Sequence, residues 1–332
     1  MNVAEAEGGP QQVFSGRAVA AMRDLFDLRR SGILLPFIAL FIALSVTSGP
    51  FFSRANLLNI VDQQASTLIP AAAGTLVLVA GGIDLSVGAV YGLAGVTAAH
   101  LALLASPALA ILVGILVGLG VGLVNGLITT VFRINPLIAT LATSYVVTGI
   151  ASLATGGNIV TDFTHPGFAD LARTSFLSVK TSTWLTLVVV VALGFLLARS
   201  TVGRYMYAAG GNAQAARLAG VRVYRVRILA FALSGTAAAL GGVIDSSRVL
   251  SAQSSSGSTL AFTVLAGIVV GGTSILGGTG AVWRSVVGVL FIALIGNGFD
   301  LLGLDPLYEQ ISLGVLLLLA VGLDAWTRLI RQ

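Results

Sequence analysis

Long apolar runs, separated by short polar stretches, fill almost the whole chain. A helix needs roughly 20 apolar residues to cross the hydrocarbon core of a bilayer, and the runs are of about this length. Lipid offers no partner to a free backbone N–H or C=O group, and the runs are too long for barrel strands, so each is expected to be helical. The pattern predicts ten spans, at about residues 31–49, 64–82, 85–105, 107–132, 136–154, 183–200, 227–246, 261–277, 283–302 and 308–326.

Two polar stretches interrupt this pattern in an informative way. The second and third runs are separated only by GGIDLSVG, which is a candidate for a break inside the membrane rather than a loop outside it. The stretch FFSRANLLNIVDQQ (51–64) is amphipathic and is expected to lie at the membrane interface.

Composition and charge indicate the class of protein and its orientation. The chain has 332 residues, of which 56% are hydrophobic and 9% are charged, whereas a soluble domain carries about a quarter charged residues. With ten spans and the N-terminus inside, the basic residues concentrate on the cytoplasmic side; the exceptions are Arg54, Arg173, Lys180 and Arg248. The prediction is an all-α polytopic membrane protein with about ten transmembrane helices and cytoplasmic N- and C-termini. The net charge of +5 then reflects topology and not a nucleic-acid partner.

This topology divides the chain into three parts. Residues 1–30 are predicted to be a cytoplasmic tail, residues 31–326 a single transmembrane domain, and residues 327–332 a second cytoplasmic tail. By parity, residues 201–226 form a cytoplasmic loop between the sixth and seventh spans, whereas residues 155–182 and 247–260 face outside.

The sequence offers little for catalysis. It contains no cysteine, and its two histidines, His100 and His165, lie far apart. Its one lysine, Lys180, lacks the preceding glycines of a phosphate-binding loop. We therefore expect no enzymatic activity, no metal and no cofactor bound by this chain itself.

Small and polar residues inside the spans carry more information. Gly114, Gly118 and Gly122 recur every four residues and predict a helix face for close packing. Neutral polar residues inside predicted spans are candidates to line a pathway for an uncharged polyol; they are Asn125, Thr140, Thr143, Ser144, Tyr145 and Asn297.

Asp84 is the carboxylate expected to lie nearest to membrane depth, with Ser86 beside it. One interpretation is a proton or substrate site at an unwound helix, in the same pathway as the neutral residues above. The other is a local cap for a helix that begins near Leu85, because carboxylates stabilise helix N-termini. The cap is favoured.

The stretch NAQAARLAG in the loop 201–226 predicts a short helix, with Asn212 as its N-cap and Gly220 as its stop. Arg217 lies on this helix, and Gly211 and Gly220 are expected to set the bends at its ends. Such a helix is a candidate docking element on the cytoplasmic face. The alternative is a solvated loop that follows the positive-inside rule.

At these residues the chain resembles a known family. The motifs GGIDLSVGAVYGL, GLVNGLI, INPLIATLAT, GRYMYAAGGNAQAARLAGVRV, ALSGTAAALGGVI and VVGGTSILGGTGAVW resemble permease subunits of ribose-type ATP-binding-cassette (ABC) importers, within the branched-chain amino acid and sugar permease superfamily. The motifs keep the family's order and cover roughly residues 50 to 326.

The resemblance implies a multi-pass permease in the bacterial inner membrane that works as a dimer, with a second copy or a paralogue. It further implies two cytoplasmic ATPase subunits that carry ATP and Mg²⁺, an external sugar-binding protein, and contact with membrane lipid. GGNAQAARLAGV corresponds to the family's coupling helix, so the predicted coupling residues are Gly211, Asn212, Ala216, Arg217 and Gly220.

The chain also departs from the family pattern. Ala261 and Thr263 stand where carboxylates are common, which bears on a ribose assignment, and Ala213 and Gln214 replace frequent acidic residues of the coupling stretch. The alternative function is an ion-coupled secondary transporter of small polar solutes. That class requires charged groups at mid-membrane, where the sequence indicates only Asp84.

Overall fold

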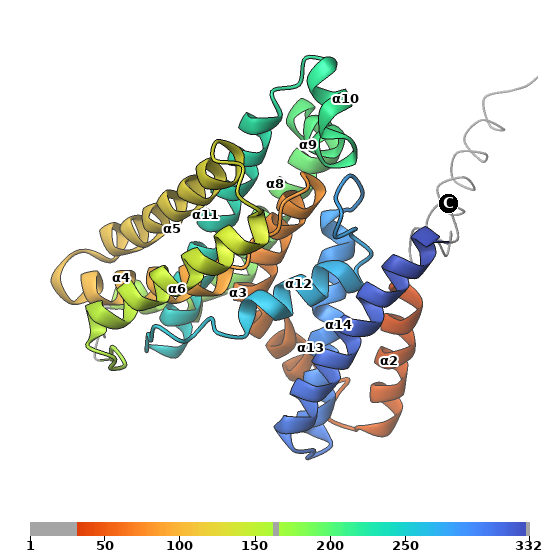
Figure 1. Cartoon of the computed structure of the whole chain (residues 1–332). Helices are drawn as coiled ribbons and strands as arrows, with labels where there is room; N and C mark the ends of the chain where they lie inside the picture. The colour runs from red at the N-terminus through yellow and green to blue at the C-terminus, as the bar shows by residue number, and fades with distance from the viewer. Residues whose placement is uncertain (1–31, 162–165, 330–332) are drawn as a thin grey trace, which may run out of the picture.

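The computed structural model describes residues 32–161 and 166–329, and most of these residues are helical. Figure 1 shows the helices as one bundle. They are α2 (Leu34–Thr47), α3 (Arg54–Val79), α4 (Val87–Leu104), α5 (Pro107–Thr130), α6 (Pro136–Thr155), α7 (Pro166–Arg173), α8 (Thr181–Arg199), α9 (Thr201–Gly211), α10 (Ala213–Leu218), α11 (Val223–Val249), α12 (Leu260–Val270), α13 (Val282–Leu301) and α14 (Pro306–Leu329). A two-residue antiparallel hairpin, β1 (Ser175–Phe176) and β2 (Val179–Lys180), precedes α8.

The expectation of an all-α, multi-pass membrane protein is confirmed. Within the described ranges, six helices are long and apolar enough to cross a membrane: α4, α5, α6, α8, α11 and α13. Shorter apolar stretches lie in α2 (Leu34–Thr47), in α12 (Leu260–Val270) and in α14, over Leu307–Gly322. The count of ten spans and the orientation of the termini stay predictions. The tail 1–30 lies outside the described residues, and α14 extends into the predicted tail 327–332 as far as Leu329.

Two of the predicted elements are wrong in their extent. The predicted span 64–82 begins too late, because α3 begins at Arg54, within the amphipathic stretch 51–64, and continues to Val79; the interfacial position of that stretch stays a prediction. The Ser53 side chain caps this helix by accepting a hydrogen bond from the Asn56 backbone N–H. The predicted span 261–277 is too long, since α12 ends at Val270 and residues 271–281 are not helical.

Helix α11 lies at the centre of the packing and contacts α3, α4, α5, α7 and α9. The glycine face of α5 is directed at it. An added Cβ at Gly122 would collide with the Phe231 carbonyl oxygen, and one at Gly118 would collide with Ala239 and the Gly235 carbonyl oxygen. The close-packing prediction for this face is therefore confirmed.

We expect Gly118→Ala to destabilise the protein by about 1–3 kcal/mol, the usual range for overpacking a close contact. Gly120→Ala is the matched control, because a Cβ at this position of the same helix meets no atom within 4 Å. Thermal unfolding of the purified protein in detergent, followed by size-exclusion chromatography, measures both. Equal midpoints for the two variants would contradict the packing argument.

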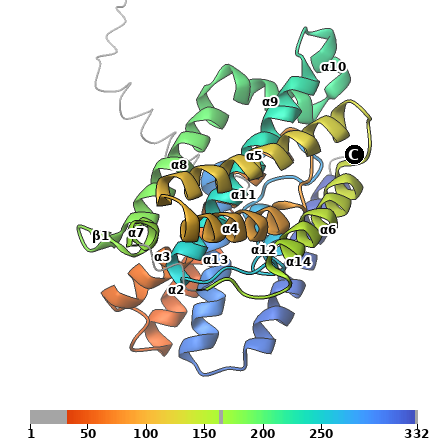
Figure 2. The ribbon, with the colours of Figure 1, turned by 90° about the vertical axis from the view of Figure 1, so that its left-hand side faces the viewer.

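The bundle has two distinct ends. At one end, α10 protrudes beyond the other helices, and the C-terminal part of α14 points toward this end (Figure 1). At the other end, the described parts of the loops 155–182 and 247–260 are joined by reciprocal backbone hydrogen bonds of 2.8 and 3.0 Å between Val160 and Ala252. Figure 2 shows α7 and β1 well away from α10. The two loops predicted to share the outer face thus do lie at one end, opposite α10.

Candidate functional site

Helix α10 is defined by its own sequence at both ends. The Asn212 side-chain oxygen accepts hydrogen bonds from the backbone N–H groups of Gln214 (3.0 Å) and Ala215 (2.9 Å). At the other end, Gly220 has a φ of +85°, and its N–H donates to the Arg217 carbonyl oxygen at 2.9 Å. Left-handed glycine closure of this kind satisfies the last helical carbonyls. The predicted N-cap and stop are therefore confirmed.

The bend before α10 differs from the expectation. Gly211 is the last residue of α9, and the extended conformation lies at Asn212, with φ −153° and ψ 99°. Asn212 therefore makes the turn and caps the helix that follows, and Gly211 does not set the bend.

The two faces of α10 are unlike each other. Ala216 is 5% exposed and packs into a buried cluster with Met206 of α9 and Val223 of α11. Arg217 is exposed, and Leu218 is 85% exposed. One face of α10 is therefore anchored to the bundle, whereas the other leaves an arginine and a leucine exposed at its surface.

A second site lies at the non-helical residues between α3 and α4. The Asp84 carboxylate accepts hydrogen bonds from the backbone N–H (3.0 Å) and hydroxyl (2.6 Å) of Ser86, just before α4, and from the Ser234 hydroxyl (2.7 Å) of α11. The bonds to Ser86 are local, of the Asx-turn kind. Helix α4 begins at Val87 with Ser86 as its N-cap, so Asp84 holds the turn before the helix and is not the cap of a helix beginning near Leu85. The bond to Ser234 ties this turn to the central helix.

Two further helices hold the same segment. The Asn125 side-chain N–H of α5 donates to the Ser86 hydroxyl at 2.8 Å, and Asn125 is fully buried. The Thr140 hydroxyl of α6 accepts a hydrogen bond from the Leu85 backbone N–H at 3.0 Å. We call Asp84, Ser86, Asn125, Thr140 and Ser234 the break network. Helices α5, α6 and α11 therefore each contribute a polar group to this segment.

The other predicted pathway residues are not part of the break network. Asn297 on α13 exchanges two side-chain hydrogen bonds, of 3.0 and 2.9 Å, with Asn56 near the start of α3. That pair and Asp84 lie at opposite ends of α3. Thr143 and Ser144 are half-buried on α6, one turn beyond Thr140. Their role in a pathway stays a prediction.

Sequence reasoning missed a charged group inside α11. Asp245 forms an ion pair with Arg248 at 2.8 Å, and both side chains are largely buried. The Tyr91 side chain of α4 lies close to Asp245 and to Ser66 of α3. Asp84 is therefore not the only carboxylate in or beside the predicted spans. The signal was present, because the predicted span 227–246 already includes Asp245.

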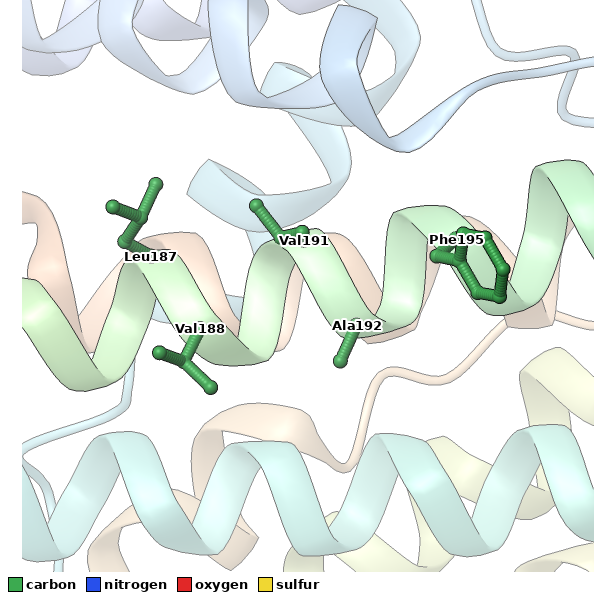
Figure 3. Close-up of a pocket in the computed structure, with 5 residues that line it drawn as sticks. All are labelled: Leu187, Val188, Val191, Ala192 and Phe195. Carbon is green, nitrogen blue, oxygen red and sulfur yellow. The ribbon is translucent and has the colours of Figure 1, made fainter.

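Helix α8 borders a hollow of about 500 Å³ that is lined only by apolar side chains. Figure 3 shows the side chains that line it, all on this one helix; they are Leu187, Val188, Val191, Ala192 and Phe195. A surface without donors or acceptors suits lipid chains and not a polar solute.

Comparison with known proteins identifies the family. A family model described as "Branched-chain amino acid transport system / permease component" matches residues 56–321. The chain belongs to this family of permeases. The matched residues include the break network and α10. No solved structure matches the chain.

Several curated members of the family are similar over nearly their whole length. The chain is 40% identical to the ribose import permease protein RbsC of Bacillus subtilis (strain 168), over 87% of this chain and 91% of that protein. It is 35% identical to RbsC of Escherichia coli (strain K12), over 94% and 98%. It is 36% identical to the L-arabinose ABC transporter permease protein AraH of Azospirillum brasilense, over 91% and 89%.

Proposed function

We propose that this chain is the membrane-spanning permease subunit of an ABC importer that takes up a sugar or a similar polyol. The observation that carries the proposal is α10, a capped and anchored helix that protrudes between α9 and α11 with Arg217 and Leu218 exposed. Related permeases of the same family are named for ribose import and as part of an L-arabinose ABC transporter, which supports a pentose or similar sugar as the substrate.

The proposed assembly follows from the two ends of the bundle. The end that carries α10 faces the cytoplasm and docks the ATPase subunits, which bind ATP and Mg²⁺. The end that carries α7 and the hairpin faces outside and receives the sugar from a binding protein. A second copy of the permease, or a paralogue, completes the pore, and the complex lies in the bacterial inner membrane. The chain itself has no catalytic role.

Reconstitution into proteoliposomes with the ATPase subunit and the binding protein tests this function. Uptake of labelled ribose or L-arabinose is expected to require ATP and to continue when a protonophore collapses the proton gradient at constant ATP. The permease alone is expected neither to bind nor to hydrolyse ATP, since Lys180, the single lysine, lies outside any phosphate-binding motif. Uptake that stops with the protonophore would favour an ion-coupled transporter instead.

A further inference from the structure

The helical conformation is interrupted at two breaks: the first is residues 80–86, after α3, and the second is residues 271–281, between α12 and α13. Both breaks contact the last residues of α9. The Gly278 backbone N–H of the second break donates to the carbonyl oxygen of Val79, the last residue of α3, at 3.0 Å. We call the residues that make these contacts the glycine junction: Gly81, Gly210, Gly211, Gly277 and Gly278.

The contacts in the glycine junction are mostly between backbones, and Gly210, Gly277 and Gly278 have no space for a side chain. A Cβ added to Gly210 would collide with the Val79 carbonyl oxygen and lie 2.6 Å from the Gly278 nitrogen. A Cβ on Gly278 would lie 2.6 Å from the Gly211 Cα. Positive φ angles, which favour glycine, occur at Gly81 (77°), Gly277 (91°) and Gly278 (75°).

Hydrogen bonds reinforce the junction from both helices that flank α10. On α9, the Tyr207 hydroxyl donates to the Gly280 carbonyl oxygen of the second break at 2.8 Å. On α11, the Arg227 Nε–H donates to the Ala80 carbonyl oxygen of the first break at 3.0 Å. The elements before and after α10 are therefore each bonded to a break.

We propose that the glycine junction transmits displacement of α10 to both breaks at once, with Gly210 and Tyr207 as positioning residues for the transport cycle. The inference rests on the proposed function, in which α10 docks onto the ATPase. Packed backbones behave as a rigid solid, because no rotatable side chain lies between them to absorb the movement. The first break leads directly to the break network, so the displacement reaches α4, α5, α6 and α11 together.

The test measures movement of the breaks in the complete complex with its ATPase subunit. A single cysteine is introduced into this cysteine-free chain at Leu276, which is 69% exposed in the second break, or at Ile83, which is half-buried in the first. Each is labelled with an environment-sensitive fluorophore, and the emission is compared before and after trapping with ATP, Mg²⁺ and vanadate. Gly210→Ala and Tyr207→Phe are then made in each background, with Gly120→Ala as the control.

In the labelled proteins without a further substitution, both labels are expected to change their emission on trapping. Gly210→Ala is expected to reduce that change at least about threefold, and Tyr207→Phe, which removes a single hydrogen bond, by about twofold. ATP hydrolysis should stay within about twofold of wild type, because α10 is untouched. Gly120→Ala should change neither readout.

Three outcomes would overturn the proposed role of the glycine junction. They are an undiminished emission change in both variants, ATP hydrolysis that falls in parallel with the emission change, and no emission change in the labelled protein that carries neither substitution. If Gly210→Ala does not assemble, Tyr207→Phe alone decides, since it adds no atom. Failure of the proposed function is a separate result. In that case the wild-type chain does not bind the ATPase subunit at all, whatever its junction.

Discussion

Replacement of Arg217 by alanine is expected to abolish stimulated ATP hydrolysis while the protein still inserts and folds. The exposed arginine lies on a short helix that is capped at its start by the Asn212 side chain, closed at its end by Gly220 and anchored at one face by Ala216. Its guanidinium group presents a planar set of donors that matches a carboxylate in two places. Truncation of one partner in an interface pair of this kind costs about 2–5 kcal/mol. Because every 1.4 kcal/mol is tenfold in affinity, we expect ATPase binding to weaken at least about tenfold.

Arg222→Ala is the matched control for this prediction. Arg222 is also exposed and basic, but it lies beyond α10, as the residue that precedes α11. Co-purification with the ATPase subunit and stimulated ATP hydrolysis are the measurements. If both variants lose the same amount, α10 is a general basic surface that contacts lipid headgroups. If Arg217→Ala keeps full hydrolysis, the docking role of this residue is wrong.

The apolar helices were predictable where the apolar pattern and the helix coincide. The predicted run 136–154 corresponds to α6 at Pro136–Thr155, because Asn135 and Pro136 start the helix and Gly156 ends it, all as local signals. The start of α3 was not predictable from hydropathy, since the helix carries Asn56 and Asp62 in its first turns. The end of α12 was hidden for the opposite reason: residues 271–281 stay rich in glycine and apolar side chains where the backbone leaves the helix.

The two candidate sites differed in how much of each could be predicted from the sequence. The N-cap and stop of α10 were predictable because each is a contact between residues two to five positions apart. The break network was only partly predictable, because Asp84 meets its partner Ser234 from 150 residues away and Ser86 meets Asn125 from 39. The same limit hid the partner of Asn297, which is Asn56, 241 residues distant; the role of Asn297 in a pathway stays a prediction. The residue types were informative, whereas which of them meet depends on helix packing.

Asp84→Asn is expected to keep both folded protein and transport within about twofold of wild type, whereas Asp84→Ala is expected to lose most of the folded protein. The carboxylate accepts three hydrogen bonds at the first break. Hydrogen bonds to a charged group contribute about 1.5–3 kcal/mol each. Removing all three therefore costs several kcal/mol, a large part of the roughly 5–15 kcal/mol by which a typical protein is stable.

Asparagine keeps the shape and most of these bonds. Its side-chain oxygen can still accept from the Ser86 N–H and hydroxyl, and its N–H can donate to Ser234, because a serine hydroxyl accepts as readily as it donates. A carboxylate that carries a proton or a cation through the membrane has no such substitute, since an amide neither ionises nor titrates in this range. A structural role and an ion-carrying role of Asp84 therefore predict opposite results for Asp84→Asn.

Fluorescence-detected size-exclusion chromatography measures the folded protein, and uptake in proteoliposomes measures transport. If Asp84→Asn folds normally but no longer transports, Asp84 acts as an ionised group in translocation, and the ion-coupled class becomes the better assignment.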